Sequence, residues 1–152
     1  MLRASQGQTQ NPKPTTTPLQ KLLQITTLLI VTGIFYYSWL PNPSLSTETY
    51  LPVWLRNWGN VYYNLRTAVP FVALGWVLEM RSHLQKQPKK NSWRFNTLFA
   101  TAIVGIAEAG QFFIHQRHPD LQDILFGIVG TLSGIAFYHS FLELIKKMRH
   151  AE

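Results

Sequence analysis

Four stretches of the chain lack charged side chains, and polar segments separate them. The stretches are residues 22–40, 67–78, 95–107 and 124–138, which contain no Asp, Glu, Lys or Arg. The first is about 19 residues long, or roughly 28 Å of α-helix, which is close to the thickness of the hydrocarbon core of a bilayer. Apolar blocks joined by charged connections are typical of a polytopic membrane protein.

We therefore predict an all-α polytopic membrane protein, folded as a bundle of four transmembrane helices. The expected helices span residues 21–40, 60–80, 93–115 and 121–145, within a membrane domain of residues 21–148. The first block is longer than the apolar region of a signal peptide, and no cleavage signal follows it, so an uncleaved helix is favoured.

The segments outside these helices are more polar. Residues 1–20 are rich in Gln, Thr, Pro and Ser, and we predict a disordered cytoplasmic tail. Three prolines interrupt residues 41–60, which predicts an interfacial loop with a short surface helix. Pro70 is expected to kink the second helix, a change that membrane helices tolerate.

The basic residues predict an orientation. The N-terminal segment up to and including Lys21, the 81–94 segment and the C-terminal tail together hold 11 of the 14 Lys and Arg residues. With four helices, these segments lie on one side of the membrane. The positive-inside rule then places both termini in the cytoplasm, with the 41–60 loop and the 116–120 segment outside.

The composition limits the classes of binding partner that the chain is expected to have. The net charge is +7, but the basic residues flank apolar blocks instead of forming a stripe with stacking aromatics. A lipid bilayer is therefore the expected anionic partner, and nucleic-acid binding is disfavoured. The absence of cysteine excludes disulfides, thiolate metal sites and a cysteine nucleophile.

Five polar residues are expected to converge near the outer surface. Glu108 and Gln111 are one turn apart on one helix face. Arg66 lies at a similar depth on the second helix, roughly 10 Å below the surface at the helical rise. Arg117 lies on the connection, and Asp123 opens the last helix, where a carboxylate suits the helix N-terminus.

Ionisable residues at membrane depth are binding-site candidates by default. We predict that Arg66, Glu108, Gln111, Arg117 and Asp123 form one outward-facing binding site, with Arg66 and Glu108 sharing an ion pair or a pocket. The alternative is a purely structural Arg66–Glu108 pair that fixes helix register. For Arg117 and Asp123, a surface salt bridge combined with a helix cap is an equal alternative.

Small residues form a stripe on the last helix. Gly127, Gly130 and Gly134 follow Asp123 at helical spacing. Such stripes allow two helices to approach closely in lipid. We predict that this stripe packs against the third helix, at Gly105 and Ala109.

A metal-binding site and a catalytic serine are both disfavoured. His115, His118 and Asp120 have spacing that a metal accepts, but histidines in such connections are commonly interfacial, and neither a metal nor another cofactor is predicted. His139 is interpreted as a packing or hydrogen-bonded residue. Ser133 lacks a clear general-base partner.

The polar hairpin resembles the VanZ-like family of small membrane proteins. The family pattern is Glu-x-x-Gln near the end of one helix, an arginine, an aspartate that opens the next helix, and spaced glycines. The matching residues are Glu108, Gln111, Arg117, Asp123, Gly130 and Gly134, with weaker similarity at Asn64, Pro70, Phe71 and Gly75. Gly127 stands where the family often has asparagine.

The resemblance implies a cell-envelope protein of the bacterial inner (plasma) membrane, and the family's namesake is linked to low-level resistance to the antibiotic teicoplanin. We favour non-enzymatic binding of an amphiphilic, lipid-linked or glycopeptide-like molecule. The alternatives are an intramembrane enzyme with Glu108 or Asp123 as general base, and a structural subunit of a membrane complex. A membrane-protein partner or a homo-oligomer is compatible with all three.

Overall fold

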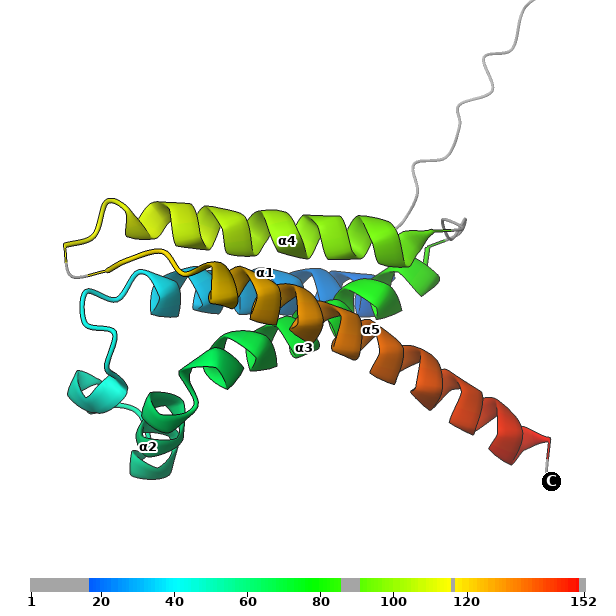
Figure 1. Ribbon diagram of the computed structural model, residues 1–152. Helices are drawn as coiled ribbons and strands as arrows, with labels where there is room; N and C mark the ends of the chain where they lie inside the picture. Colours follow the sequence, from blue (N-terminus) through cyan, green and yellow to red (C-terminus); the bar gives the residue numbers. More distant parts are fainter. Residues whose placement is uncertain (1–16, 86–90, 116, 151–152) are drawn as a thin grey trace, which may run out of the picture.

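The computed structural model describes residues 17–85, 91–115 and 117–150, and every regular element in them is helical (Figure 1). The elements are α1 (Pro18–Ser38), the short 3₁₀ helix η1 (Leu45–Thr47), α2 (Val53–Val61), α3 (Tyr63–His83), α4 (Ser92–Gln111) and α5 (Leu121–Arg149). The all-α class agrees with the sequence. Residues 86–90 of the basic 81–94 segment lie outside the described residues.

Helix α1 begins earlier than expected because its start is capped. The Thr17 hydroxyl accepts a hydrogen bond from the backbone N–H of Gln20, and the Gln20 side chain accepts one from the backbone N–H of Thr17. This capping box, with Pro18 in the first turn, stabilises the helix start. The expected tail therefore ends before Pro18, and its residues 1–16 lie outside the described residues.

The expected helix over 60–80 corresponds to α3, which begins and ends three residues later than predicted. The chain leaves helical geometry at Tyr62, between α2 and α3, and Figure 1 shows α2 turned away from the line of α3. Helix α3 then runs through Pro70 to His83. The expected surface helix within residues 41–60 is present as α2, together with η1.

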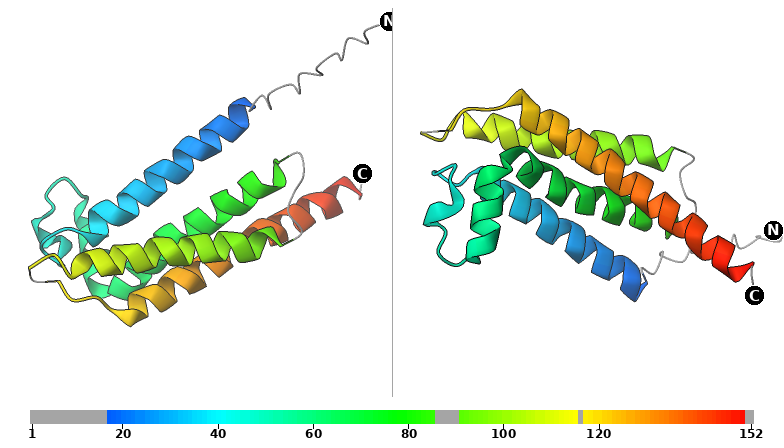
Figure 2. Two further views of the ribbon diagram at one scale, coloured as in Figure 1. Left: turned by 90° about the horizontal axis from the view of Figure 1, so that it is seen from above. Right: turned by 60° about the horizontal axis from the view of Figure 1, so that its bottom comes forward.

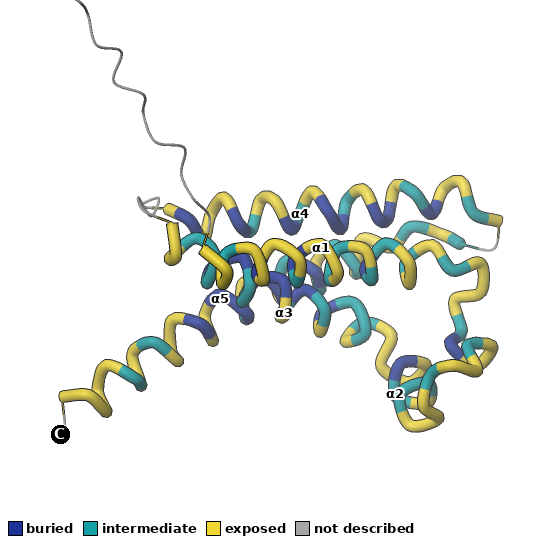
Figure 3. Tube along the Cα trace, turned by 180° about the vertical axis from the view of Figure 1, so that it is seen from behind, coloured by how far each residue is buried: buried dark blue, intermediate teal, exposed yellow. Residues whose placement is uncertain are grey.

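Four long helices, α1, α3, α4 and α5, lie alongside one another (Figure 2). Helix α3 is central, since it contacts all the other α-helices and makes its most extensive contact with α5. The core is apolar and lies mid-length, with Phe71 and Leu74 of α3 against Val104 of α4. Figure 3 shows this buried middle and the exposed C-terminal half of α5.

The glycine stripe of α5 packs mainly against α3, so the predicted partner was wrong for two of its three glycines. A Cβ on Gly130 would overlap the Ala68 carbonyl oxygen, and one on Gly134 would overlap that of Val72. Gly127 does face α4, where a Cβ would lie 3.2 Å from a Val104 methyl group.

Helix α3 also contributes a glycine to this contact. A Cβ on Gly75 would overlap the carbonyl oxygen of Thr131. The expected contact point on α4, Gly105, has no atom within 4 Å of such a Cβ. Close backbone approach therefore joins α3 to α5.

The prediction of four transmembrane helices is wrong. Among the described residues, only α1 and α5 are long and apolar enough to cross a membrane. Helices α3 and α4 have sufficient length, but polar and charged residues along them, such as Arg66, Glu79 and Glu108, leave them less apolar than a span requires. Charge-free blocks of about a dozen residues, counted in isolation, overstated their apolar length.

The two candidate spans associate the chain with a membrane. Helix α1 exposes large apolar side chains along its length, including Leu22, Leu28 and Leu29, each more than half exposed. Helix α5 exposes Leu125, Val129 and Phe137 to a similar extent. Exposed apolar side chains in such number are expected to face lipid or another apolar partner.

Candidate functional site

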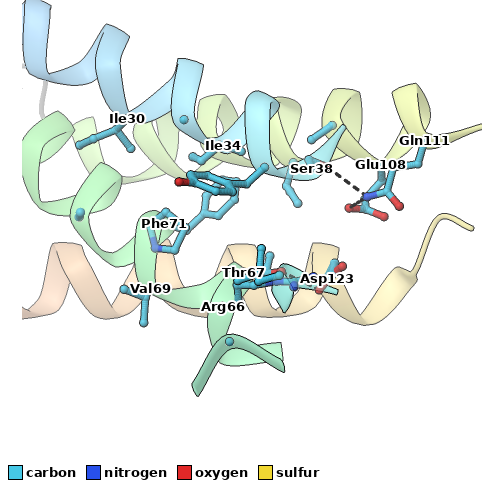
Figure 4. A pocket seen from close by; sticks show the side chains of 18 of the residues that line it. Ile30, Ile34, Ser38, Arg66, Thr67, Val69, Phe71, Glu108, Gln111 and Asp123 are labelled. Atoms are coloured by element: carbon cyan, nitrogen blue, oxygen red, sulfur yellow. Dashed lines mark hydrogen bonds between the residues drawn. The ribbon is translucent and has the colours of Figure 1, made fainter. Parts of the chain in front are cut away.

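A cavity of about 390 Å³ lies between α1, α3 and α4. Residues of the η1–α2 segment and of the start of α5 also line it. Figure 4 shows Ile30 and Phe71 toward one end, and Glu108 and Gln111 toward the other. The volume lies within the range of about 300–1,000 Å³ typical of small-molecule sites.

The structure brings all five residues of the expected binding site to this cavity. They come from α3, α4, the α4–α5 connection and the first turn of α5, and are Arg66, Glu108, Gln111, Arg117 and Asp123. The sequence reasoning missed the apolar part of the lining. That part includes Ile30 and Ile34 of α1, Trp58 of α2 and Phe71 of α3.

Glu108 holds the α4–α5 connection in place. Its side chain is buried, and Oε1 accepts a hydrogen bond from Gln111 Nε2 at 2.8 Å. The other oxygen, Oε2, accepts one from the backbone N–H of Asp120 at 3.0 Å. Gln111 Nε2 also donates to the Ser38 hydroxyl at 3.1 Å. The carboxylate therefore connects α4 to the next segment and, through Gln111, to α1.

Arg117 binds the C-terminal end of α1. Its Nε donates to the Leu40 carbonyl oxygen at 2.9 Å, and its Nη2 donates to that of Tyr37 at 3.4 Å. Carbonyl groups at a helix C-terminus lack intrahelical donors, and a basic side chain there satisfies them. Arg66 makes a similar contact, because its Nη1 donates to the Pro43 carbonyl oxygen at 2.9 Å.

The expected ion pair between Arg66 and Glu108 is absent. The ion pairs within 4.0 Å among the described residues both involve Glu79, so Arg117 and Asp123 form no salt bridge either. Arg66 has its electrostatic interaction with Asp123. Asp123 Oδ1 accepts a hydrogen bond from the Thr67 hydroxyl at 2.7 Å, and the helix cap is Asp120, which accepts from the backbone N–H of Gln122.

Burial changes the pKa of three groups that lie outside both candidate spans. It raises the pKa of Glu108, against the opposing effect of the hydrogen bond from Asp120. Burial lowers the pKa of Arg117, and the nearby Arg66 charge adds to this. Burial also lowers the pKa of Arg66, partly offset by Asp123. Loss of hydration thus disfavours the charged form of the carboxyl group and of both guanidinium groups.

A second polar cluster, which the sequence reasoning missed, surrounds Glu79 near the other end of α3. Glu79 is 1% exposed. Its oxygens accept hydrogen bonds of 2.7 Å each from the Ser92 hydroxyl and from Asn96 Nδ2. The available signal was the Glu79-x-x-x-His83 spacing, which places both side chains on one helix face.

Comparisons of the chain with protein-family models, curated proteins and solved structures found no match.

Replacing Glu108 with alanine is expected to lower the free energy of unfolding by about 1–3 kcal/mol, because the backbone N–H of Asp120 loses its acceptor and the buried Gln111 amide loses one of its two. Glu108→Gln should cost less, since the Gln111 amide can rotate and accept from the new side chain. Denaturant titration in detergent measures both. Glu143→Ala, at an exposed position, is the control and should stay near wild type. Equal stability of the three variants would contradict the assignment.

Proposed function

We propose that this chain is a bacterial inner-membrane protein that binds an amphiphilic molecule of the cell envelope. The apolar part of the ligand occupies the cavity between α1, α3 and α4. The polar head group lies at Arg66 and Arg117. The observation that carries the proposal is a single cavity with an apolar lining toward one end and charged, hydrogen-bonding groups toward the other.

The two candidate spans support the proposed location. Helices α1 and α5 run in opposite directions, and the start of α1 and the end of α5 lie at the same end of the molecule (Figure 2). With α1 and α5 crossing the membrane, both termini are on one side. The basic residues at these helix ends are Lys21, Lys146 and Lys147. They support a cytoplasmic location for that side.

The resemblance to the VanZ-like family supports the ligand class. The residues that carry it, among them Glu108, Gln111, Arg117 and Asp123, line the cavity. The namesake's link to teicoplanin suggests a lipid-linked or glycopeptide-like ligand. A general-base role for Glu108 has less support, because both of its oxygens already accept hydrogen bonds.

A cavity-filling variant tests the proposal. Gly33 lines the cavity, and a Cβ there meets no atom within 4 Å. Gly33→Leu should therefore fill the cavity without displacing a helix. Gly105→Leu is the matched control, since a Cβ there is also free of contacts and Gly105 does not line the cavity.

The probe is a photoreactive dodecyl phosphate, cross-linked to the full chain in phosphatidylcholine nanodiscs and competed with unlabelled dodecyl phosphate. Saturable labelling is expected for the wild type and for Gly105→Leu, with labelled peptides mapping to the cavity. Gly33→Leu should weaken binding at least about tenfold, the effect of losing roughly 1.4 kcal/mol. Identical saturable labelling of all three proteins, or none of the wild type, would show that the cavity is not the site.

A further inference from the structure

A carboxylate and two imidazoles meet between α3 and α5, near the end of α3 that lies away from the cavity. Glu79 and His83 are one turn apart on α3, and His139 comes from α5. Glu79 Oε1 lies 3.3 Å from His139 Nε2 and 3.7 Å from His83 Nε2. The three ligand atoms all lie within 4.8 Å of one another.

The two separations from Glu79 suit one bound metal ion. Zinc binds histidine nitrogen and carboxylate oxygen at about 2.0–2.2 Å, and tetrahedral ligands at that radius lie roughly 3.4 Å apart. The two distances from Glu79 bracket this value. Two histidines and one glutamate form a known donor set for zinc, with the fourth position left for water.

The surroundings of Glu79 resemble the outer shell of a metal ligand. Ser92 and Asn96 each donate a hydrogen bond to one carboxylate oxygen, which fixes the orientation of the group. Ser82 in turn lies 3.1 Å from Asn96 Nδ2. These hydrogen bonds thus hold the carboxylate of Glu79 in one position without a bound ion.

The buried charge of Glu79 is a second, independent reason to expect a bound cation here. Glu79 is almost fully buried, and an isolated buried carboxylate is costly. Among the described residues, the basic side chains within 4.0 Å of it are the two histidines, which carry charge only when protonated, and no lysine or arginine. The His83 and His139 side chains are 34% and 46% exposed, which leaves an open side for a fourth ligand.

We propose that Glu79, His83 and His139 bind a zinc ion that joins α3 to α5, with Ser92 and Asn96 as positioning residues for the carboxylate. The site is separate from the amphiphile cavity, because none of its ligands lines that cavity. It also differs from the His115, His118 and Asp120 set that the sequence suggested and disfavoured.

Zinc binding to the full chain, purified in detergent with its affinity tag removed, tests the proposal. Competition with a chromophoric chelator should give one zinc ion per chain, and X-ray absorption should show only nitrogen and oxygen ligands, including two imidazoles. His139→Ala and His83→Ala should abolish stoichiometric binding. Asn96→Ala should weaken binding about 10–100-fold, as loss of an outer-shell partner does.

His118→Ala is the matched control, because it removes an exposed histidine elsewhere, and should bind like the wild type. Absence of stoichiometric zinc in the wild type would overturn the proposal and leave Glu79 as a hydrogen-bonded ion-pair residue. Unchanged binding in His139→Ala and His83→Ala would also overturn it. The absorption spectrum of the wild type decides the matter if a variant fails to fold, since a spectrum without two imidazoles excludes this site.

Discussion

Replacing Gly134 with alanine is expected to lower the free energy of unfolding by about 3 kcal/mol or more, at the upper end of the usual cost of overpacking. A Cβ on Gly134 would overlap the carbonyl oxygen of Val72 and lie 2.9 Å from the backbone nitrogen of Trp76. Backbone atoms cannot rotate away as a flexible side chain can. Helix α5 would therefore have to move off α3, its most extensive contact.

The same substitution at Gly105 is the control. A Cβ there meets nothing within 4 Å, so Gly105→Ala should leave packing intact and raise stability by up to about 1 kcal/mol through helix propensity. Unfolding of both variants in mixed micelles, followed by circular dichroism, measures the difference. Equal stabilities would mean that α3 and α5 do not approach at Gly134.

The glycine stripe shows what helical spacing can and cannot predict. Spacing placed Gly127, Gly130 and Gly134 on one face of α5, and all three do meet a neighbouring helix. It could not choose the neighbour, because that depends on how four helices pack. Gly75 of α3, which lies against Thr131 of α5, was the complementary signal that identifies the partner.

The membrane prediction failed for a different physical reason. Blocks without charge locate apolar segments, but a span needs about 20 consecutive apolar residues. The charge-free runs of α1 (residues 22–38) and α5 (residues 124–142) come close to that length, whereas Arg66 and Glu79 interrupt α3, and Glu108 interrupts α4. Two of these residues, Arg66 and Glu108, also marked the candidate site, so the same side chains argued against the spans that were expected to contain them.

The sequence pattern predicted which residues lie together in the candidate site, but it did not predict which groups they bind. The position of a residue along a helix predicts its depth below the surface. Arg66 and Glu108 were predicted at similar depth, and both line the same cavity. It does not give the direction in which a side chain leaves the helix. Backbone groups then decided the partners: Glu108 accepts a hydrogen bond from the N–H of Asp120, and Arg66 donates one to the carbonyl oxygen of Pro43. A pattern of side chains cannot reveal such backbone groups.

Replacing Arg66 with glutamine is expected to weaken binding of the dodecyl phosphate probe about 10–150-fold. Hydrogen bonds to charged groups contribute about 1.5–3 kcal/mol, and each 1.4 kcal/mol is a factor of about ten in affinity. Hydrogen bonds of Arg66 with the described residues use only Nη1, so the rest of the guanidinium is available to a phosphate. The measurement is the competition cross-linking assay in nanodiscs.

Arg56→Gln is the control for Arg66→Gln. It shows whether weaker binding comes from a lost head-group contact or only from the loss of a positive charge or of loop structure. Arg56 also donates from Nη1 to a carbonyl oxygen of the same connection, that of Ser46, but it does not line the cavity. Both variants remove one positive charge and one tether of the α1–α2 connection, yet only Arg66→Gln should weaken phosphate binding. Competition by dodecanol, which has the same chain and no charge, should be unchanged in Arg66→Gln. If Arg56→Gln weakens phosphate binding as much, or dodecanol competition falls in parallel, the guanidinium of Arg66 does not recognise the head group.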